Sequence, residues 1–252
     1  MLTEKELEAK KRFCYSLEGS IDENRIAVPL LNDYVEIYKL GLESCVFSLN
    51  RGIAMMREFF DRGAKKFFID LKFRDTPQTV YRASKRCALP GVYMFDLYVD
   101  GGEEMCKRAI DGAREGAEDY KIEKPKIIGV TELTSLSDGD LRKQGLNVRY
   151  DDLIRRRTEL ALELGLDGVV CPASKAGNLE KEFGFNPNFL YVTPGIKWKG
   201  KNGIGQKQLY TPNRAIRECK NSILVVGSAI TEAEDKQKTA YEILRAMARE
   251  LQ

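Results

Sequence analysis

The sequence predicts a single (β/α)8 barrel that spans residues 1–252. Short apolar segments alternate with longer amphipathic segments along almost the whole chain, and eight of the apolar segments have the length of strands. The 252 residues, of which 43% are hydrophobic, fit one barrel or two smaller domains. No shift in composition divides the chain, so the uninterrupted alternation favours the barrel.

The predicted strands and helices follow one another in chain order. The strands are residues 12–17, 35–40, 66–71, 92–97, 126–131, 168–171, 189–193 and 222–227. Helical patterns occupy residues 3–10 before the first strand, 50–62, 103–115, 151–164 and 179–183 between strands, and 235–251 after the last strand.

The first strand requires a choice between two apolar segments, 12–17 and 25–30. Parallel neighbours need a crossover of about a dozen residues, but only four residues separate Leu30 from the strand that follows. We therefore place the strand at 12–17 and a helix within 19–34. Ser20 and Glu23 form a capping-box pattern at the start of this helix, and we expect Pro29 to end or kink it.

The composition excludes several classes of function. The 41 basic and 38 acidic residues leave a net charge of +3, too small and too dispersed for a nucleic-acid-binding surface. The sequence contains neither a membrane-spanning apolar run nor a secretory signal, so we expect a cytoplasmic protein. Its six cysteines lack C-x-x-C spacing, which favours reduced thiols.

The chain contains no histidine. This excludes Ser-His-Asp and Cys-His hydrolysis, and it leaves lysine, aspartate, glutamate and tyrosine to carry protons.

A cluster of charged residues lies in the segment FFIDLKFRDTPQTV, residues 67–80. Asp70 and Lys72 are two residues apart and would project from one face of an extended strand, with Asp75 just beyond. At the mouth of the barrel, Lys39 from the second strand would extend the cluster into an alternating array of charges. Such clusters are typical of catalytic sites, and a surface ion-pair turn is the alternative.

Other strand ends bring further polar residues to the expected mouth. The connection at 194–212 is rich in glycine and lysine, and we interpret it as a mobile basic lid suited to closing on an anion. A solvated lysine-rich loop is the alternative interpretation. The additional strand-end residues are Glu18, Thr134, Ser135, Gly227 and Ser228, and the lysines of the connection are Lys197, Lys199, Lys201 and Lys207.

The sequence resembles the orotidine 5'-monophosphate decarboxylase family. The resemblance rests on YKLGLE at 38–43, DLKFRDTPQTV at 70–80, TELTSL at 131–136, DGVVCPA at 167–173, VTPGI at 192–196 and VVGSAIT at 225–231. It implies decarboxylation of orotidine 5'-monophosphate (OMP) to UMP in pyrimidine biosynthesis, without a metal or other cofactor.

The resemblance also implies roles for individual residues. Lys72, in a charged network with Lys39 and Asp70, would supply a proton to C6 of the pyrimidine. Asp75 and Thr79 would enter the site of a neighbouring subunit, which implies an obligate homodimer with shared active sites. Among the remaining substrate-binding positions, Ser135 would bind the pyrimidine edge and Gln206 would reach phosphate and base. The other expected substrate-binding residues are Glu18, Thr134, Pro194, Gly227 and Ser228.

Three positions depart from the family pattern. Ser228 replaces the arginine that grips the phosphate, Glu18 replaces a ribose-binding aspartate, and Tyr98 replaces a histidine after the fourth strand. We therefore expect a weakened or rebuilt phosphate site, made from backbone N–H groups after Gly227 and a lid lysine such as Lys207.

Two other functions fit parts of the pattern. A magnesium-dependent sugar-phosphate decarboxylase or aldolase of the same barrel group would share the D-x-K-x-x-D spacing, although the LTS and VTPGI segments favour the OMP decarboxylase. A non-catalytic nucleotide-binding paralogue would account for Ser228 and Tyr98. It would not account for the presence of all four charged residues, Lys39, Asp70, Lys72 and Asp75.

Overall fold

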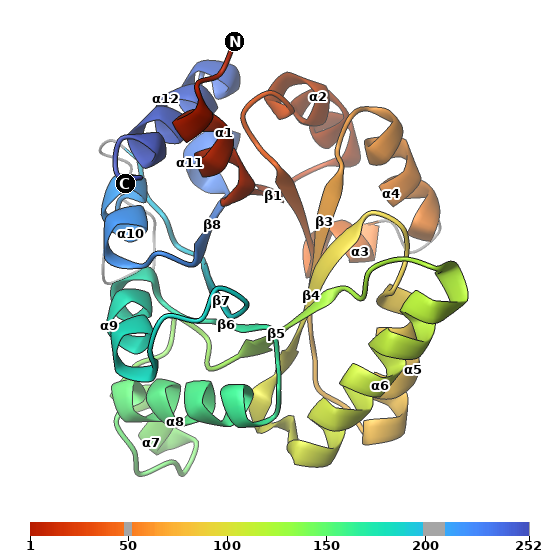
Figure 1. Cartoon of the computed structure of the whole chain (residues 1–252), viewed down its shortest axis with the longest axis vertical. Coiled ribbons are helices and arrows are strands. Elements are labelled where there is room, and N and C mark those ends of the chain that lie inside the picture. The colour runs from red at the N-terminus through yellow and green to blue at the C-terminus, as the bar shows by residue number, and fades with distance from the viewer. Residues whose placement is uncertain (48–51, 199–209, 252) are drawn as a thin grey trace.

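The computed structural model describes residues 1–47, 52–198 and 210–251. Within these residues, eight parallel strands form a closed barrel in which each strand is hydrogen-bonded to the next in chain order and β8 closes on β1. The helices surround the strands (Figure 1). The predicted (β/α)8 barrel is therefore confirmed.

Each strand overlaps its predicted segment. Cys14 pairs with Ile37 of the second strand and with Val225 of the last, so the choice of the first strand was correct. The strands are β1 (Phe13–Leu17), β2 (Ile37–Gly41), β3 (Lys66–Phe73), β4 (Val92–Tyr98), β5 (Lys126–Val130), β6 (Gly168–Val170), β7 (Leu190–Thr193) and β8 (Ser222–Val226).

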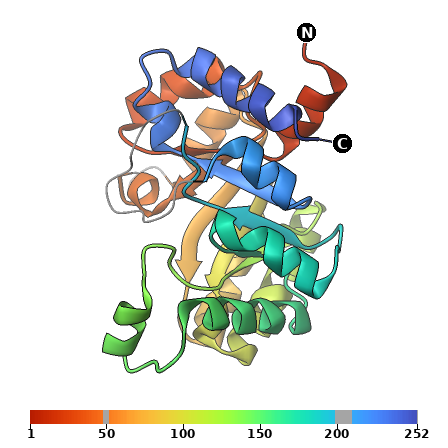
Figure 2. The ribbon, with the colours of Figure 1, turned by 90° about the vertical axis from the view of Figure 1, so that its left-hand side faces the viewer.

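The helices cover the outside of the barrel, and the first and last of them lie side by side, where Lys5 Nζ donates to Leu251 O at 2.6 Å (Figures 1 and 2). No helix in the described part of the chain is long and apolar enough to cross a membrane. The helices are α1 (Glu4–Lys11), α2 (Ile21–Leu31), α3 (Leu42–Phe47), α4 (Gly52–Asp61), α5 (Pro77–Cys87), α6 (Glu103–Tyr120), α7 (Asp138–Lys143), α8 (Tyr150–Glu163), α9 (Ala173–Phe183), α10 (Pro212–Glu218), α11 (Ser228–Thr231) and α12 (Lys236–Ala248), with a 3₁₀ turn η1 (Val99–Gly101).

Helix α2 begins as its sequence predicts, but Pro29 does not end it. Ser20 Oγ accepts from the N–H of Glu23 at 3.2 Å, and the Glu23 carboxylate accepts from the N–H of Ser20 at 2.8 Å. Pro29 lies two residues before the end of the helix. Because proline has no N–H to donate, the carbonyl of Arg25 lacks its helical partner, and Arg62 Nη1 approaches that carbonyl at 3.5 Å instead.

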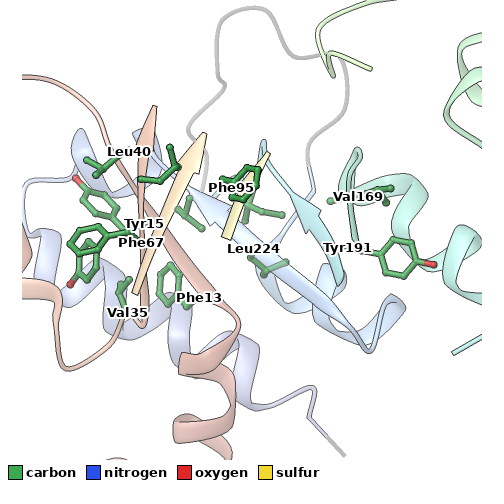
Figure 3. Close-up of a cluster of buried hydrophobic side chains, with 14 of the residues drawn as sticks. Phe13, Tyr15, Val35, Leu40, Phe67, Phe95, Val169, Tyr191 and Leu224 are labelled. Carbon is green, nitrogen blue, oxygen red and sulfur yellow. The ribbon is translucent and has the colours of Figure 1, made fainter. Parts of the chain in front are cut away.

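Two apolar layers lie on the two faces of the barrel. Inward-facing side chains such as Cys14, Ile37, Phe68 and Met94 fill its interior. The outward-facing side chains pack under the helices; among them are Phe13, Tyr15, Phe67, Phe95 and Leu224 (Figure 3). Because both faces are buried, the strands are apolar along most of their length. Polar residues that continue the inward-facing rows at the strand ends therefore point into the mouth of the barrel.

Helices α5 and α6 pack closely where α6 has glycines. A Cβ on Gly112 would lie 2.2 Å from the carbonyl oxygen of Tyr81, and one on Gly116 would lie 2.3 Å from that of Lys85. These contacts are with backbone atoms, so a larger side chain would push the two helices apart.

We expect Gly112→Ala to lower the free energy of unfolding by about 1–3 kcal/mol through overpacking, although alanine is favoured over glycine in helices by about 1 kcal/mol. Gly139→Ala in α7 is the matched control, since the nearest atom to its Cβ is Ser137 Oγ at 3.6 Å. The control should be neutral or slightly stabilising. Urea denaturation measures both changes, and a Gly112→Ala variant as stable as the parent would contradict this packing.

Candidate active site

A cavity of about 210 Å³ opens at the carboxyl ends of the barrel strands. Its charged lining consists of Lys39, Asp70, Lys72 and Glu132. Its apolar lining consists of Phe68, Val130, Val170, Val192 and Val225, all from the interior layer of the barrel, and Leu133, Thr134 and Pro194 complete it. The cavity thus combines a charged wall with an apolar one.

Asp70 lies between two ammonium groups. Lys39 Nζ is 2.9 Å from Asp70 Oδ2, and Lys72 Nζ contacts Asp70 Oδ1. The side chain of Asp70 is 13% exposed, so both ion pairs form in a largely desolvated place. The prediction that Lys39, Asp70 and Lys72 form one network is confirmed in geometry.

The two ammonium groups keep Asp70 ionised. Burial alone would raise the pKa of Asp70, but Lys39, a hydrogen bond with Asp96, and Lys72 together lower it to about 2. For Lys72, burial would lower the pKa, but Asp96 and Asp70 outweigh burial and raise it. Near neutral pH the network therefore consists of two cations around one anion.

The backbone at Lys72 is not extended as the sequence suggested. Lys72 has a φ of 50°, in the left-handed region that few residues other than glycine adopt. The register between β3 and β4 shifts between Ile69 and Phe73, and the N–H of Lys72 donates to Asp96 Oδ1 at 2.7 Å. Lys72 therefore reaches Asp70 from an irregular, left-handed position near the end of β3 and not through flat strand alternation.

Asp75 lies outside the network within one chain. It is exposed before α5, where its Oδ1 accepts from the N–H of Thr76 at 2.6 Å. The four charged residues therefore do not form one array within a single chain, and the second carboxyl group beside Lys72 is Asp96, with Oδ2 4.0 Å from Lys72 Nζ. The acidic residue within the apolar segment VYMFDLY was the signal for Asp96, because a buried carboxyl needs a partner.

A second ion-pair network, also missed in the sequence, supports Glu132 in the cavity wall. Arg157 of α8 donates to Glu132 Oε2 and to Asp100 Oδ2, both at 2.7 Å, and to the carbonyl of Thr131 at 2.5 Å. Arg157 thus joins α8 to the ends of β4 and β5 and balances the negative charge that Glu132 brings to the cavity.

The remaining predicted site residues occupy three places. Thr134 and Pro194 line the cavity and also a neighbouring cavity of about 310 Å³ beside β5, β6 and β7, whereas Ser135 is exposed and lines neither. Thr79 is half-buried in α5, where its hydroxyl pairs with that of Thr76 at 2.9 Å. Tyr98 ends β4 and packs on the interior layer.

Glu18 and Gly227 meet at the junction of β1 and β8. A Cβ on Gly227 would lie 2.6 Å from Glu18 Oε1, so a larger residue at this position would require the Glu18 carboxylate to shift. Ser228 follows as the first residue of the short helix α11. These three residues line neither of the two cavities.

Most of the predicted lid cannot be placed. Gln206 and the lysines Lys199, Lys201 and Lys207 lie outside the described residues. The two flanks of the connection meet, since the N–H of Lys197 donates to the carbonyl of Tyr210 at 3.0 Å.

Fold and site together define a (β/α)8-barrel enzyme that places lysine and aspartate side chains at the carboxyl ends of its strands. Residues 13–243 match the model of the "Orotidine 5'-phosphate decarboxylase / HUMPS family". The chain belongs to this family.

The chain is similar in sequence to proteins named orotidine 5'-phosphate decarboxylase. The chain is 36% identical over 225 residues to an orotidine 5'-phosphate decarboxylase of Coxiella burnetii, covering 89% of this chain and 91% of the relative. It is 37% identical over 197 residues to one of Aliivibrio fischeri, covering 78% and 81%. The crystal structure of the Lactobacillus acidophilus orotidine 5'-phosphate decarboxylase superposes with a TM-score of 0.77 at 30% identity, covering 93% of this chain and 98% of that one.

We expect Arg157→Met to lower the free energy of unfolding by about 3–5 kcal/mol, because it leaves the buried carboxylate of Glu132 without its cation and removes the closer of the two cations of Asp100. Arg155→Met, on the same helix, removes a half-exposed pair with Glu182 and should cost less than about 1 kcal/mol. Chemical denaturation at pH 7 compares the two variants. Equal losses would contradict a special role for the Arg157 network.

Proposed function

We propose that the protein is an orotidine 5'-monophosphate decarboxylase, a carboxy-lyase of pyrimidine biosynthesis that converts OMP to UMP and carbon dioxide. The observation that carries the proposal is the ammonium of Lys72, held beside Asp70 in the wall of a small cavity at the barrel mouth. Membership of the family and the decarboxylase relatives support it.

The chemistry requires a fixed positive charge. When the bond between C6 and the carboxylate breaks, carbon dioxide leaves and the electron pair stays on C6. An ammonium held in place before the reaction stabilises that charge without reorganisation. Lys72 then donates a proton from Nζ to C6, becomes a neutral amine and regains a proton from solvent.

Asp70 and the apolar lining contribute in different ways. The Asp70 carboxylate would repel the carboxylate of OMP, and this repulsion would end as neutral carbon dioxide forms. Lys39 and Lys72 hold Asp70 in place despite that repulsion. Phe68, Val170 and Val192 offer an apolar surface that suits carbon dioxide better than a carboxylate.

The substrate-binding roles remain part of the proposal. Thr134 and Pro194 are placed to contact the base, since both line the cavity, and Ser135 and Gln206 would bind its polar edge. Glu18 would bind the ribose. The phosphate would be held by N–H groups following Gly227, near Ser228, and by a lysine of the 194–212 connection such as Lys207.

We further propose a homodimer with shared active sites. Asp75 and Thr79 sit just after β3, outside the network of their own chain. In the dimer, Asp75 would approach Lys72 of the partner and extend the array of charges. A cytoplasmic location fits the cysteines, which are thiols and not disulfides.

The magnesium-dependent alternative is not favoured. The relatives are orotidine 5'-phosphate decarboxylases. The direct test is the loss of OMP ultraviolet absorbance with purified protein, with and without a chelator. Absence of turnover would refute the proposal, and turnover abolished by the chelator would support the alternative.

We expect Lys72→Ala to reduce turnover by about 10³-fold or more, because it removes both the stabilising charge and the acid. UMP binding, measured by calorimetry, should change little. Lys66→Ala is the control at the other end of β3, where Lys66 pairs with Glu36 at 3.0 Å and is 40% exposed. Substantial turnover in Lys72→Ala would refute its role.

Shared sites predict complementation between inactive variants. Mixing Lys72→Ala with Asp75→Asn in equal amounts, followed by subunit exchange, gives mixed dimers in half of the population, each with one intact site. About a quarter of wild-type activity should return. If no activity returns although native mass spectrometry shows mixed dimers, each site is made by one chain alone.

A further inference from the structure

Asp96 is an acidic side chain in the middle of the apolar strand β4, with no exposed surface. Its Oδ1 accepts from the N–H of Lys72 at 2.7 Å. Its Oδ2 is buried and receives no N–H or O–H donor among the described residues, and Lys72 Nζ, at 4.0 Å, is too far away for a hydrogen bond. Asp96 lines neither of the two mouth cavities.

The charged neighbours of this unsatisfied oxygen are Lys72 and Asp70. An ionised Asp96 would leave a buried carboxylate oxygen without a donor, which is costly, whereas a protonated Asp96 could donate to the neighbouring Asp70. Asp70 lies between two ammonium groups and is the better anion. The proton therefore belongs to Asp96, which agrees with the pKa of Asp96 being raised by burial and by the charge of Asp70.

We propose that Asp96 is a positioning residue that acts as a neutral acid, accepting the backbone N–H of Lys72 and donating a hydrogen bond to Asp70. This role rests on the proposed decarboxylase activity, since it acts through Lys72 and Asp70. The first bond fixes the left-handed backbone that aims Lys72 at the cavity. The second fixes the Asp70 carboxylate between its two cations.

The neutral state of Asp96 has an electrostatic consequence. With Asp96 uncharged, Lys39, Asp70 and Lys72 of one chain sum to a charge of +1, and the proposed approach of the partner's Asp75 would bring the sum to zero. An ionised Asp96 would make either sum more negative by one unit, which would weaken the attraction for an anionic substrate and for the negative charge that develops at C6. Asp96 thus supports the backbone and Asp70 without adding a negative charge.

Asp96→Asn and Asp96→Ala separate this role from simple packing. The asparagine amide can accept from Lys72 and donate to Asp70, as a protonated aspartate does, so kcat should stay within about threefold of wild type. Alanine makes neither bond, and kcat should fall about 10²-fold, the loss expected when a reacting group shifts by about 1 Å. KM should change little, because Asp96 does not line the cavity.

Ser84→Ala is the control. Ser84 is equally buried and its hydroxyl also has no hydrogen-bond partner in the described residues, but it lies in α5, away from the cavity lining. It should leave kcat unchanged. An Asp96→Asn variant as impaired as Asp96→Ala would overturn the neutral-acid role, and a fully active Asp96→Ala would overturn the positioning role.

A stability measurement tests the proton on Asp96 even if the protein does not decarboxylate OMP. The titratable groups that face Asp96 are Asp70 and Lys72 on β3, the Cys87 thiol at the end of α5 and, further along its own strand, Tyr98, whereas β5 places Ile128 opposite it. Above pH 4 the unfolded chain releases the Asp96 proton and the folded chain retains it, which favours unfolding as the pH rises. An asparagine at this position does not titrate, so the stability of the Asp96→Asn variant lacks this dependence on pH.

Asp96→Asn should therefore raise the melting temperature at pH 7 relative to wild type, and this gain should shrink towards pH 4. A gain that does not change with pH, or a melting temperature below that of wild type at pH 7, would overturn the assignment of the proton to Asp96. Absence of OMP turnover in the wild-type protein would refute only the proposed function.

Discussion

The carboxylate of Asp70, shared between the ammonium groups of Lys39 and Lys72, is the interaction on which the site depends. Its place follows from the barrel, because Phe68 fills the interior and the next inward-facing residue of β3 enters the mouth. Lys39 enters the mouth for the same reason, because it is an inward-facing residue near the end of β2. Without Asp70, two cations would face each other in a desolvated cavity, a cost that only a fixed anion between them removes.

Charged side chains are stable at the barrel mouth because each has a hydrogen-bond or ion-pair partner on another element of the fold. Asp96 of β4 supports the left-handed backbone at Lys72, and Arg157 of α8 neutralises Glu132. The end of β8 differs, since Glu18 lies against Gly227 and Ser228 offers no positive charge. Phosphate recognition in the proposed function therefore depends on backbone N–H groups at this junction and on a cation from elsewhere in the chain, whereas Lys39, Asp70 and Lys72 already meet within one chain.

The barrel could be predicted from the sequence because parallel strands buried on both faces leave continuous apolar segments at regular spacing. Lys39, Asp70 and Lys72 could be grouped because strand ends meet in a barrel mouth. Asp96 and Arg157 could not, since their partners are distant in sequence and depend on the register between β3, β4 and β5. Nor does a sequence pattern specify the left-handed backbone of Lys72, which a side chain from another strand stabilises.

The central claim is that the Lys72 ammonium stabilises negative charge at C6 of a bound nucleotide. Calorimetry with UMP and with 6-hydroxy-UMP, whose oxyanion places negative charge at that position, tests it most directly. The wild-type protein should bind 6-hydroxy-UMP at least about 10²-fold more tightly than UMP, and Lys72→Ala should lose that preference. Equal affinities of the wild-type protein for the two nucleotides would contradict the account.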